Sequence, residues 1–199
     1  SLKNVDERIR KRSTVAWVPV KMPLEDLRVL HNADRPIRIV WPHRWEHDKN
    51  PEALLAIARE QTTQLDLRWI ILGESFRKIP KALQEFETEF SEQIDHMGFV
   101  DSKQEYWQWL HKADWVLSTA THEFFGIAVV EALLAGCLPW LPTRLSYPEL
   151  LPENCRDLSP IKPPDNPSEI RLSISKHLLP ATAQIAVKKI DEICHAVFA

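Results

Sequence analysis

Two glutamates near the start of a predicted helix are the clearest candidates for chemistry in this sequence. Glu123 lies in a loop just before Gly126, and Glu131 follows in the helix that this glycine opens. The first turn of a helix offers backbone N–H groups and the positive end of a dipole, which together attract phosphate. A carboxylate only accepts hydrogen bonds, so it suits sugar and ribose hydroxyls. The pattern favours a nucleotide-sugar site, although two glutamates at this spacing also occur by chance.

Basic residues in the first strand–helix loop form a second candidate group. The segment WPHRWEHDK, residues 41–49, contains Arg44 and Lys49. Arginine offers a planar fork to phosphate oxygens, and lysine offers a compact positive charge. Cations held beside a departing diphosphate stabilise its developing negative charge without a metal ion. Taken alone, the same residues fit solvated loop charges equally well.

The same loop contains a pattern that is typical of zinc hydrolases. Residues His43 to His47 match H-x-x-E-H, in which both histidines must share one face of a helix. Pro42 precedes the segment and Pro51 follows it, so we expect no long helix there. The sequence also lacks a D-x-D pair at a predicted strand end and a spaced Cys/His cluster. We therefore expect neither a metal site nor a cofactor.

Apolar runs alternate with helical patterns along most of the chain. The pattern predicts helices beginning at Pro51 and Ser102, others near 80–92 and 181–198, one opened by Gly126, and strands at 14–20, 37–42, 67–72, 94–97, 114–118 and 138–141. Such alternation predicts the α/β class, with a mostly parallel sheet covered by helices on both faces. The candidate loops all follow strands, so they should gather at one edge of the sheet.

The motif over 41–49 and the motif HEFFGIAVVEA over 122–132 together resemble a subgroup of the family 4 retaining glycosyltransferases. That subgroup is the tRNA-queuosine mannosyltransferase family, and YPEL at 147–150 is similar to it as well. The resemblance covers about residues 14–155. It implies a Rossmann-like three-layer domain, the C-terminal half of the two-domain GT-B fold.

The resemblance also implies roles for the charged residues. Arg44 and Lys49 would hold the diphosphate, Glu123 would contact hydroxyls of the transferred sugar, and Glu131 would contact the ribose. Arg44, Lys49 and Glu123 would be the catalytic residues. The departing phosphate itself would receive the proton of the acceptor, so no protein base is expected in this half.

Further binding residues come from the loops at the same edge. By the same resemblance, backbone N–H groups of Phe124, Phe125 and Gly126 would meet the phosphate or the sugar. Loops containing Gly73 and Phe99 would hold the base, largely through backbone groups. Plain turns at Gly73 and Phe99 remain an alternative of almost equal weight.

The function that the resemblance implies is the donor-binding half of a glycosyltransferase. Mannose, GDP-mannose and queuosine in tRNA would be the hexose, the donor and the acceptor. The expected partners are the nucleotide sugar, an N-terminal acceptor domain and tRNA. Without the acceptor domain, we expect this chain alone to be inactive. Two alternatives stay open: a nucleotide-sugar or RNA-binding module without catalysis, and another GT-B enzyme such as a nucleotide-sugar epimerase.

Composition sets limits on the class of protein and its compartment. The apolar fraction is 44%, the charged fraction 27% and the net charge −3, as in an ordinary globular protein without a surface-wide affinity for nucleic acid. No apolar run reaches the length of a membrane span. Cys137, Cys155 and Cys194 stand in apolar surroundings, which indicates reduced, buried thiols in a cytoplasmic protein.

We expect three parts along the chain. Residues 1–34 would form an N-terminal flank or interdomain linker with an edge strand. Residues 35–158 would form the nucleotide-sugar-binding domain. Residues 159–199 would supply a proline-rich connection and the closing helices of the same domain.

Overall fold

The computed structural model describes residues 13–22, 35–74 and 78–198. The chain divides into two compact units, one over 23–178 and one made of 1–22 with 179–199. Each unit is described by itself. Much of the expected flank at 1–34 lies outside the described residues, and the expected domain boundaries stay a prediction.

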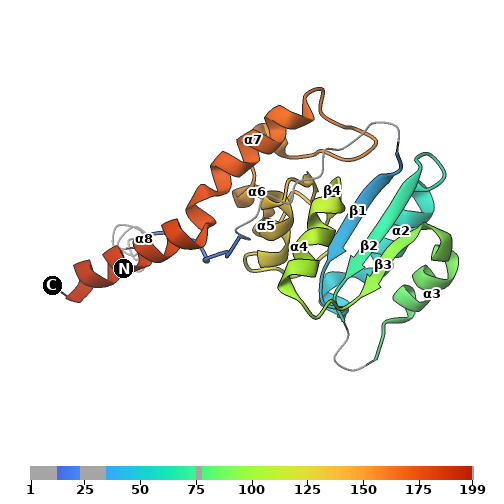
Figure 1. The fold of residues 1–199 in the computed structure, drawn as a ribbon, viewed down its shortest axis with the longest axis horizontal. Helices are drawn as coiled ribbons and strands as arrows, with labels where there is room; N and C mark the ends of the chain where they lie inside the picture. The colour runs from blue at the N-terminus through green and yellow to red at the C-terminus, as the bar shows by residue number, and fades with distance from the viewer. Residues whose placement is uncertain (1–12, 23–34, 75–77, 199) are drawn as a thin grey trace, which may run out of the picture. The chain divides into compact units, whose positions relative to one another are not determined.

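The larger unit is built on a sheet of five parallel strands (Figure 1). The strands occur in the spatial order β3-β2-β1-β4-β5. Their bounds are β1 Ile37–Pro42, β2 Leu67–Leu72, β3 Ile94–Gly98, β4 Trp115–Leu117 and β5 Leu138–Trp140. The five strands lie where the sequence predicts them, and each differs from its expected range by no more than two residues.

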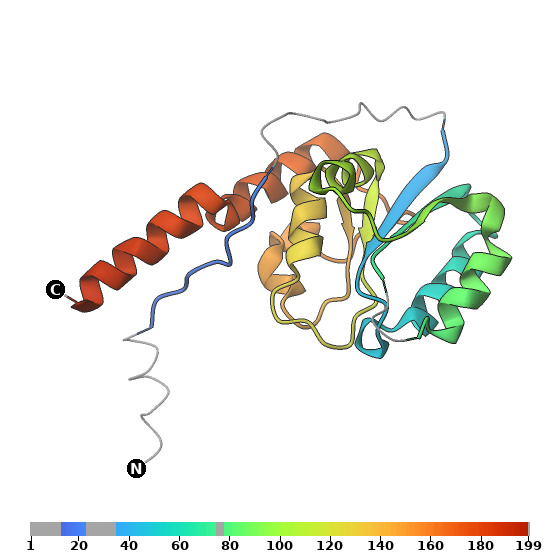
Figure 2. The same ribbon diagram turned by 60° about the horizontal axis from the view of Figure 1, so that its bottom comes forward.

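Helices cover both faces of this sheet (Figure 2). On one face α2 packs against α3, and on the other α4 and α5 pack together, with α7 against α5. The helices are α2 Pro51–Gln61, α3 Lys81–Glu89, α4 Lys103–Lys112, α5 Ile127–Leu134, α6 Tyr147–Leu150 and α7 Pro167–Leu178. Short 3-10 turns lie at His47–Lys49, Ser91–Gln93 and Glu153–Cys155. The layers confirm the predicted α/β class.

The central strands are buried on both faces, as parallel strands usually are. In β1, Ile39, Val40 and Trp41 are all fully buried. Ile39 and Trp41 join Trp69 and Phe86 in the apolar cluster that includes residues of α2 and α3. This core fixes the strands, and the strands in turn fix the loops at their carboxyl ends.

Asn50 begins α2 with an uncommon backbone conformation. Its φ is +53°, in the left-handed region, and its side chain accepts a hydrogen bond from the backbone N–H of Ala53 at 3.2 Å. Asparagine tolerates this region better than most residues and is a preferred N-cap. Pro51 follows at the first helical position, as the sequence predicts. The cap therefore sets where the first strand–helix loop ends.

The smaller unit contains one long helix, α8, over Ala183–Phe198. The edge strand expected at 14–20 is wrong: the only pairing described for residues 13–22 is a single parallel bridge from Val20 to Thr182. Pro19 cannot donate to a strand ladder, which favours this outcome. Cys194 is exposed on α8, so the expectation of a buried thiol holds only for Cys137 and Cys155.

No helix in the described part of the chain is both long enough and apolar enough to cross a lipid bilayer.

The Asn50 cap generates a prediction about stability. Asn50→Ala should lower the free energy of unfolding by roughly 2–3 kcal/mol, because it removes the cap and puts alanine in the left-handed region. Asn50→Gly should cost less, since glycine adopts this φ without strain. Urea unfolding provides the measurement.

The matched control is Asn166, whose side chain caps α7 by accepting from the N–H of Glu169 at 3.2 Å. Asn166 is not among the residues with positive φ. Asn166→Ala should therefore cost only the cap, about 1 kcal/mol. Equal losses at Asn50 and Asn166 would contradict the role given to backbone strain.

Candidate functional site

Hydrogen bonds join the loop that follows β1 to the loop that follows β4. The backbone N–H of Thr121 donates to the carbonyl of Asp48 at 2.7 Å, and the Thr121 hydroxyl donates to the same oxygen at 3.0 Å. The Thr119 hydroxyl donates to the carbonyl of Lys49 at 2.6 Å. Because β1 and β4 are neighbours in the sheet, segments some 70 residues apart meet here. We call these four residues the loop junction.

The side chain of Lys49 crosses this junction. Its ammonium donates to the carbonyl of His122 at 2.9 Å and pairs with Glu123 Oε2 at 3.3 Å and Asp48 Oδ2 at 3.0 Å. The Lys49 side chain is only 9% exposed. A buried ammonium must be paired, and these three oxygens satisfy it. The two candidate groups of the sequence therefore form one site through Lys49 and Glu123.

Glycine at position 126 shapes the start of α5. Gly126 has φ +83°, and a Cβ there would lie 3.4 Å from the Tyr147 ring and 3.5 Å from Glu123 Cγ. Tyr147 is fully buried, and its hydroxyl lies 2.7 Å from the Ser118 hydroxyl. Burial raises the pKa of Tyr147 to about 12, so this residue remains a neutral support under the loop. In the described structure no side chain caps α5. Its first turn thus suits an anion.

The two phenylalanines of the loop differ in their surroundings. Phe124 is fully exposed, and its backbone N–H donates to Glu123 Oε1 at 3.1 Å. Phe125 is half-buried, and its carbonyl accepts from the Ser146 hydroxyl at 3.2 Å. The N–H of Phe124 therefore points to Glu123, whereas the prediction assigned it to phosphate or sugar.

Glu131, which the resemblance assigns to the ribose, is largely buried. The residue is only 6% exposed, and its carboxylate pairs with the Lys103 ammonium at 2.5 Å. It also hydrogen-bonds the Tyr106 hydroxyl, and burial together with this carboxylate raises the pKa of Tyr106. The carboxylate of Glu131 is therefore paired within the protein and is not open to solvent. The cause is α4, whose first two turns cover this part of α5.

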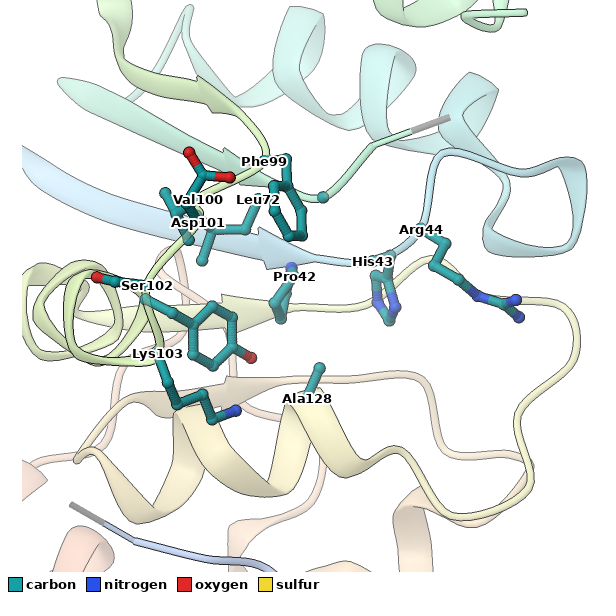
Figure 3. A pocket seen from close by; sticks show the side chains of 12 residues that line it. Pro42, His43, Arg44, Leu72, Phe99, Val100, Asp101, Ser102, Lys103 and Ala128 are labelled. Atoms are coloured by element: carbon teal, nitrogen blue, oxygen red, sulfur yellow. The ribbon is translucent and has the colours of Figure 1, made fainter. Parts of the chain in front are cut away.

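A cavity of about 390 Å³ opens beside these residues at the carboxyl edge of the sheet (Figure 3). Three of the predicted site residues, Arg44, Gly73 and Phe99, lie on its wall. Arg44 is mostly exposed and pairs with Glu46 at 3.5 Å, so its guanidinium can move without loss of burial. The wall consists of Pro42, His43, Arg44, Leu72, Gly73, Phe99, Val100, Asp101, Ser102, Lys103, Tyr106 and Ala128.

The backbones at the ends of β1 and β2 approach each other closely at Gly73. Its φ is +120°, and a Cβ at this position would lie 2.2 Å from the carbonyl oxygen of His43. Only glycine fits such an approach. This contact holds the residue after β1 in a fixed place on the cavity wall.

His43 is buried at this place and remains neutral. Burial, helped by the nearby Lys49, lowers its pKa from 6.5 to about 3. Its ring packs edge-on against Trp41, with centroids 5.1 Å apart. The two histidines of the zinc pattern do not share one face of a helix, because His43 follows β1 in a loop whereas His47 begins a 3-10 turn and is exposed. The described residues contain no cluster of three potential metal ligands.

Three residues of this site are not predicted by the sequence patterns. His43 matches only the zinc pattern, and no motif marks Lys103 or Tyr106 as part of the site. The signal for the last two was present, since Ser102 caps a helix that follows a strand at the same edge. No sequence pattern indicates that His43 is buried.

Comparisons with known proteins identify the family and the fold of the chain. A family model described as "Glycosyl transferases group 1" matches residues 25–144. The tRNA-queuosine alpha-mannosyltransferase of Drosophila melanogaster is 35% identical over 161 residues, covering 76% of this chain. The alignment spans 42% of the length of that relative.

Two solved structures show the same fold. Anabaena Alr3699/HepE, in complex with UDP and glucose, superposes with a TM-score of 0.62 at 15% identity, over 88% of this chain and 53% of the other. The C-terminal domain of the group 1 family protein LpcC from Francisella tularensis gives 0.51 at 20% identity, over 75% and 80%. The likeness confirms the predicted Rossmann-like half of a GT-B fold.

The neutral state of His43 generates a prediction about acid stability. Below pH 6.5 the unfolded chain takes up a proton at His43, whereas the folded protein does so only near pH 3. This contribution is therefore present above pH 6.5 and is lost as the pH falls toward 3, by about 1.4 kcal/mol per pH unit. Between pH 7 and 5, the wild type should lose roughly 2 kcal/mol more than His43→Gln in urea unfolding.

His47→Gln serves as the control, because His47 is exposed in the same loop. It should lose stability with pH in parallel with the wild type. Parallel curves for the wild type and His43→Gln would show that His43 is not held neutral by the fold.

Proposed function

Because the chain belongs to the group 1 glycosyl transferases, we propose that it holds the sugar donor of a retaining glycosyltransferase. The donor is a nucleoside diphosphate hexose. The observation that carries this proposal is the meeting of Lys49 with Glu123 beside the first turn of α5. That arrangement brings a cation, a hydroxyl acceptor and helix N–H groups to one place.

Each part of the site has a task in this reaction. As the glycosidic bond breaks, negative charge grows on the departing diphosphate. Arg44 on the cavity wall, the ammonium of Lys49 and the first turn of α5 stabilise that charge. Glu123, already oriented by Lys49, accepts hydrogen bonds from hydroxyls of the transferred sugar.

The nucleoside part of the donor occupies the cavity and the groups behind it. The wall near Phe99 is mainly apolar and suits a base, in keeping with the predicted role of the loops at Gly73 and Phe99. Glu131 accepts the ribose hydroxyls from its place beside Lys103. The proposal keeps the roles that the sequence predicts for Arg44, Lys49, Gly73, Phe99, Glu123 and Glu131.

The similarity to the Drosophila relative, a tRNA-queuosine alpha-mannosyltransferase, supports a specific sugar and acceptor. We propose mannose as the hexose, GDP-mannose as the donor and queuosine in tRNA as the acceptor, in the cytoplasm. Catalysis also requires an acceptor-binding domain, because the matched region spans 42% of that relative.

A donor-binding or RNA-binding module without catalysis is the second candidate. The full exposure of Phe124 favours it, since an unpaired aromatic ring can stack on a base. Titration with GDP, UDP and a tRNA distinguishes the candidates. Tight tRNA binding without nucleotide binding would contradict the donor-site proposal.

The two glutamates should respond differently to substitution. Glu131→Ala should weaken binding of the nucleoside diphosphate at least about tenfold, because each hydrogen bond to a carboxylate contributes ~1.5–3 kcal/mol. Glu123→Ala should leave this affinity nearly unchanged, since Asp48 and the carbonyl of His122 still hold Lys49. Isothermal titration calorimetry provides the measurement.

The burial of Glu131 calls for a control on folding. Glu131→Gln keeps the shape of the side chain and should also weaken binding, while urea unfolding reports its stability. Equal effects of Glu123→Ala and Glu131→Ala on nucleotide affinity would mean that the two roles are wrongly assigned.

Donor binding should not require a metal ion. Arg44 and Lys49 can balance the charge of a diphosphate, so we expect the same nucleotide affinity with and without EDTA. The measurement is the calorimetric affinity for GDP and UDP in both buffers. A strict requirement for Mg²⁺ or Mn²⁺ would overturn this prediction.

The chain alone should transfer little or no sugar. Holding donor and acceptor together contributes roughly 7–11 kcal/mol to catalysis, and this contribution needs an acceptor site. An assay of mannose transfer from GDP-mannose to queuosine-containing tRNA, with residues 1–199 only, provides the test. Robust transfer would show that no further domain is needed.

A further inference from the structure

His43 has no task in the proposed function, although it lies on the wall of the donor cavity. It takes its place between Pro42, the last residue of β1, and Arg44. The residue is 5% exposed. Burial of an imidazole removes its polar nitrogens from water, which lowers stability unless they form hydrogen bonds.

The ring of His43 contains a buried nitrogen without a hydrogen-bond partner in the part of the chain that the structure describes. Among the described residues, none lies within hydrogen-bonding distance of Nε2. A buried polar atom left in this state lowers stability unless a ligand or a water molecule completes its hydrogen bonding. His43 is one of the residues that line the cavity. Nε2 is buried in this structure, so a small rotation of the ring would let it meet an atom bound in the cavity.

Close contacts hold the backbone of His43 in place. Its backbone carbonyl faces Gly73, where even a Cβ atom would not fit. Its ring packs against Trp41, whose indole N–H donates to the Thr119 hydroxyl at 2.9 Å. Thr119 belongs to the loop junction and also contacts the carbonyl of Lys49. The Trp41 ring beside His43 is therefore held by a residue that also contacts Lys49.

The surroundings of the ring favour an anionic ligand. Figure 3 shows the His43 ring and Ala128, in the first turn of α5, directed toward the same space. Arg44 lies on the same wall, and Lys49 is near enough to affect the pKa of His43. Helix N–H groups and two cations attract phosphate. A neutral imidazole adds a hydrogen bond there without further charge.

We propose that His43 binds the diphosphate group of the donor, with Nε2–H donating to a phosphate oxygen. This assignment rests on the proposed function and adds a donor-recognition residue to it. It requires the tautomer of the neutral ring in which Nε2 carries the proton. The buried nitrogen then gains its hydrogen bond when the nucleotide is bound.

Calorimetry with the whole chain tests the assignment. His43→Leu should weaken binding of GDP or UDP about tenfold or more, because a hydrogen bond to a charged acceptor is lost. His43→Gln, which offers an amide N–H of similar reach, should restore most of the affinity. His47→Leu is the matched control in the same loop and should bind as the wild type does.

A comparison of ligands separates a contact with phosphate from a structural role. The loss caused by His43→Leu should be large for GDP and small for guanosine. Equal losses for both ligands would show a general disturbance of the cavity and overturn the assignment. Wild-type affinity for GDP in His43→Leu would overturn it as well, while leaving the proposed function intact. Failure of the wild type to bind either diphosphate would overturn both.

Nitrogen NMR gives a second test, which uses only the wild-type chain and therefore does not depend on the folding of a variant. Nε2 of His43 should have the chemical shift of a protonated ring nitrogen in the GDP complex, and it should shift on addition of GDP but not of guanosine. A ring nitrogen that does not respond to GDP would mean that a buried water, and not phosphate, is the partner of Nε2.

Discussion

The buried ammonium of Lys49 is the interaction on which the rest of the site depends. It contacts the carbonyl of His122 and two carboxylates, those of Asp48 and Glu123. Without Lys49, these two acids would face each other at a partly buried place and repel. With it, the loops after β1 and β4 share one charge-balanced centre. The first turn of α5 is presented beside that centre.

The sheet makes this centre possible because its strand order brings distant segments together. β1 and β4 are neighbours, so their loops meet, and the loop after β2, on the other side of β1, contributes Gly73. The cavity wall continues to the loop after β3 and to α4, which supplies Lys103. Rigid strands hold these groups in place, and the loops supply the chemistry.

Much of this arrangement could be predicted from residue patterns. Gly126 and Pro51 indicate where two helices begin, and the alternation of strands and helices indicates the fold class. The gathering of the two candidate groups at one edge follows from parallel strands whose loops share that edge, whereas the direct pairing of Lys49 with Glu123 does not. Side-chain burial could not be predicted in the same way. Glu131 is covered by α4, and this depends on packing between helices that no local pattern encodes.

His43 shows a second limit of such reasoning. The local sequence pattern of His43 matches that of zinc hydrolases but carries no information on its surroundings. Those depend on the Trp41 ring and on the approach of Gly73, both contacts made in three dimensions. The edge strand expected near Val20 failed for a related reason, because β-forming residues become a strand only where a partner strand is present.

The loop junction also limits how this fold can be altered by recombination or design. The hydroxyl of Thr119 and the hydroxyl and backbone N–H of Thr121 donate to carbonyls in the other loop. The conformation of each loop therefore depends on the backbone of the other. A loop grafted alone from another protein would leave these donors and Lys49 without acceptors. The two loops therefore have to be exchanged together, although about 70 residues separate them along the chain.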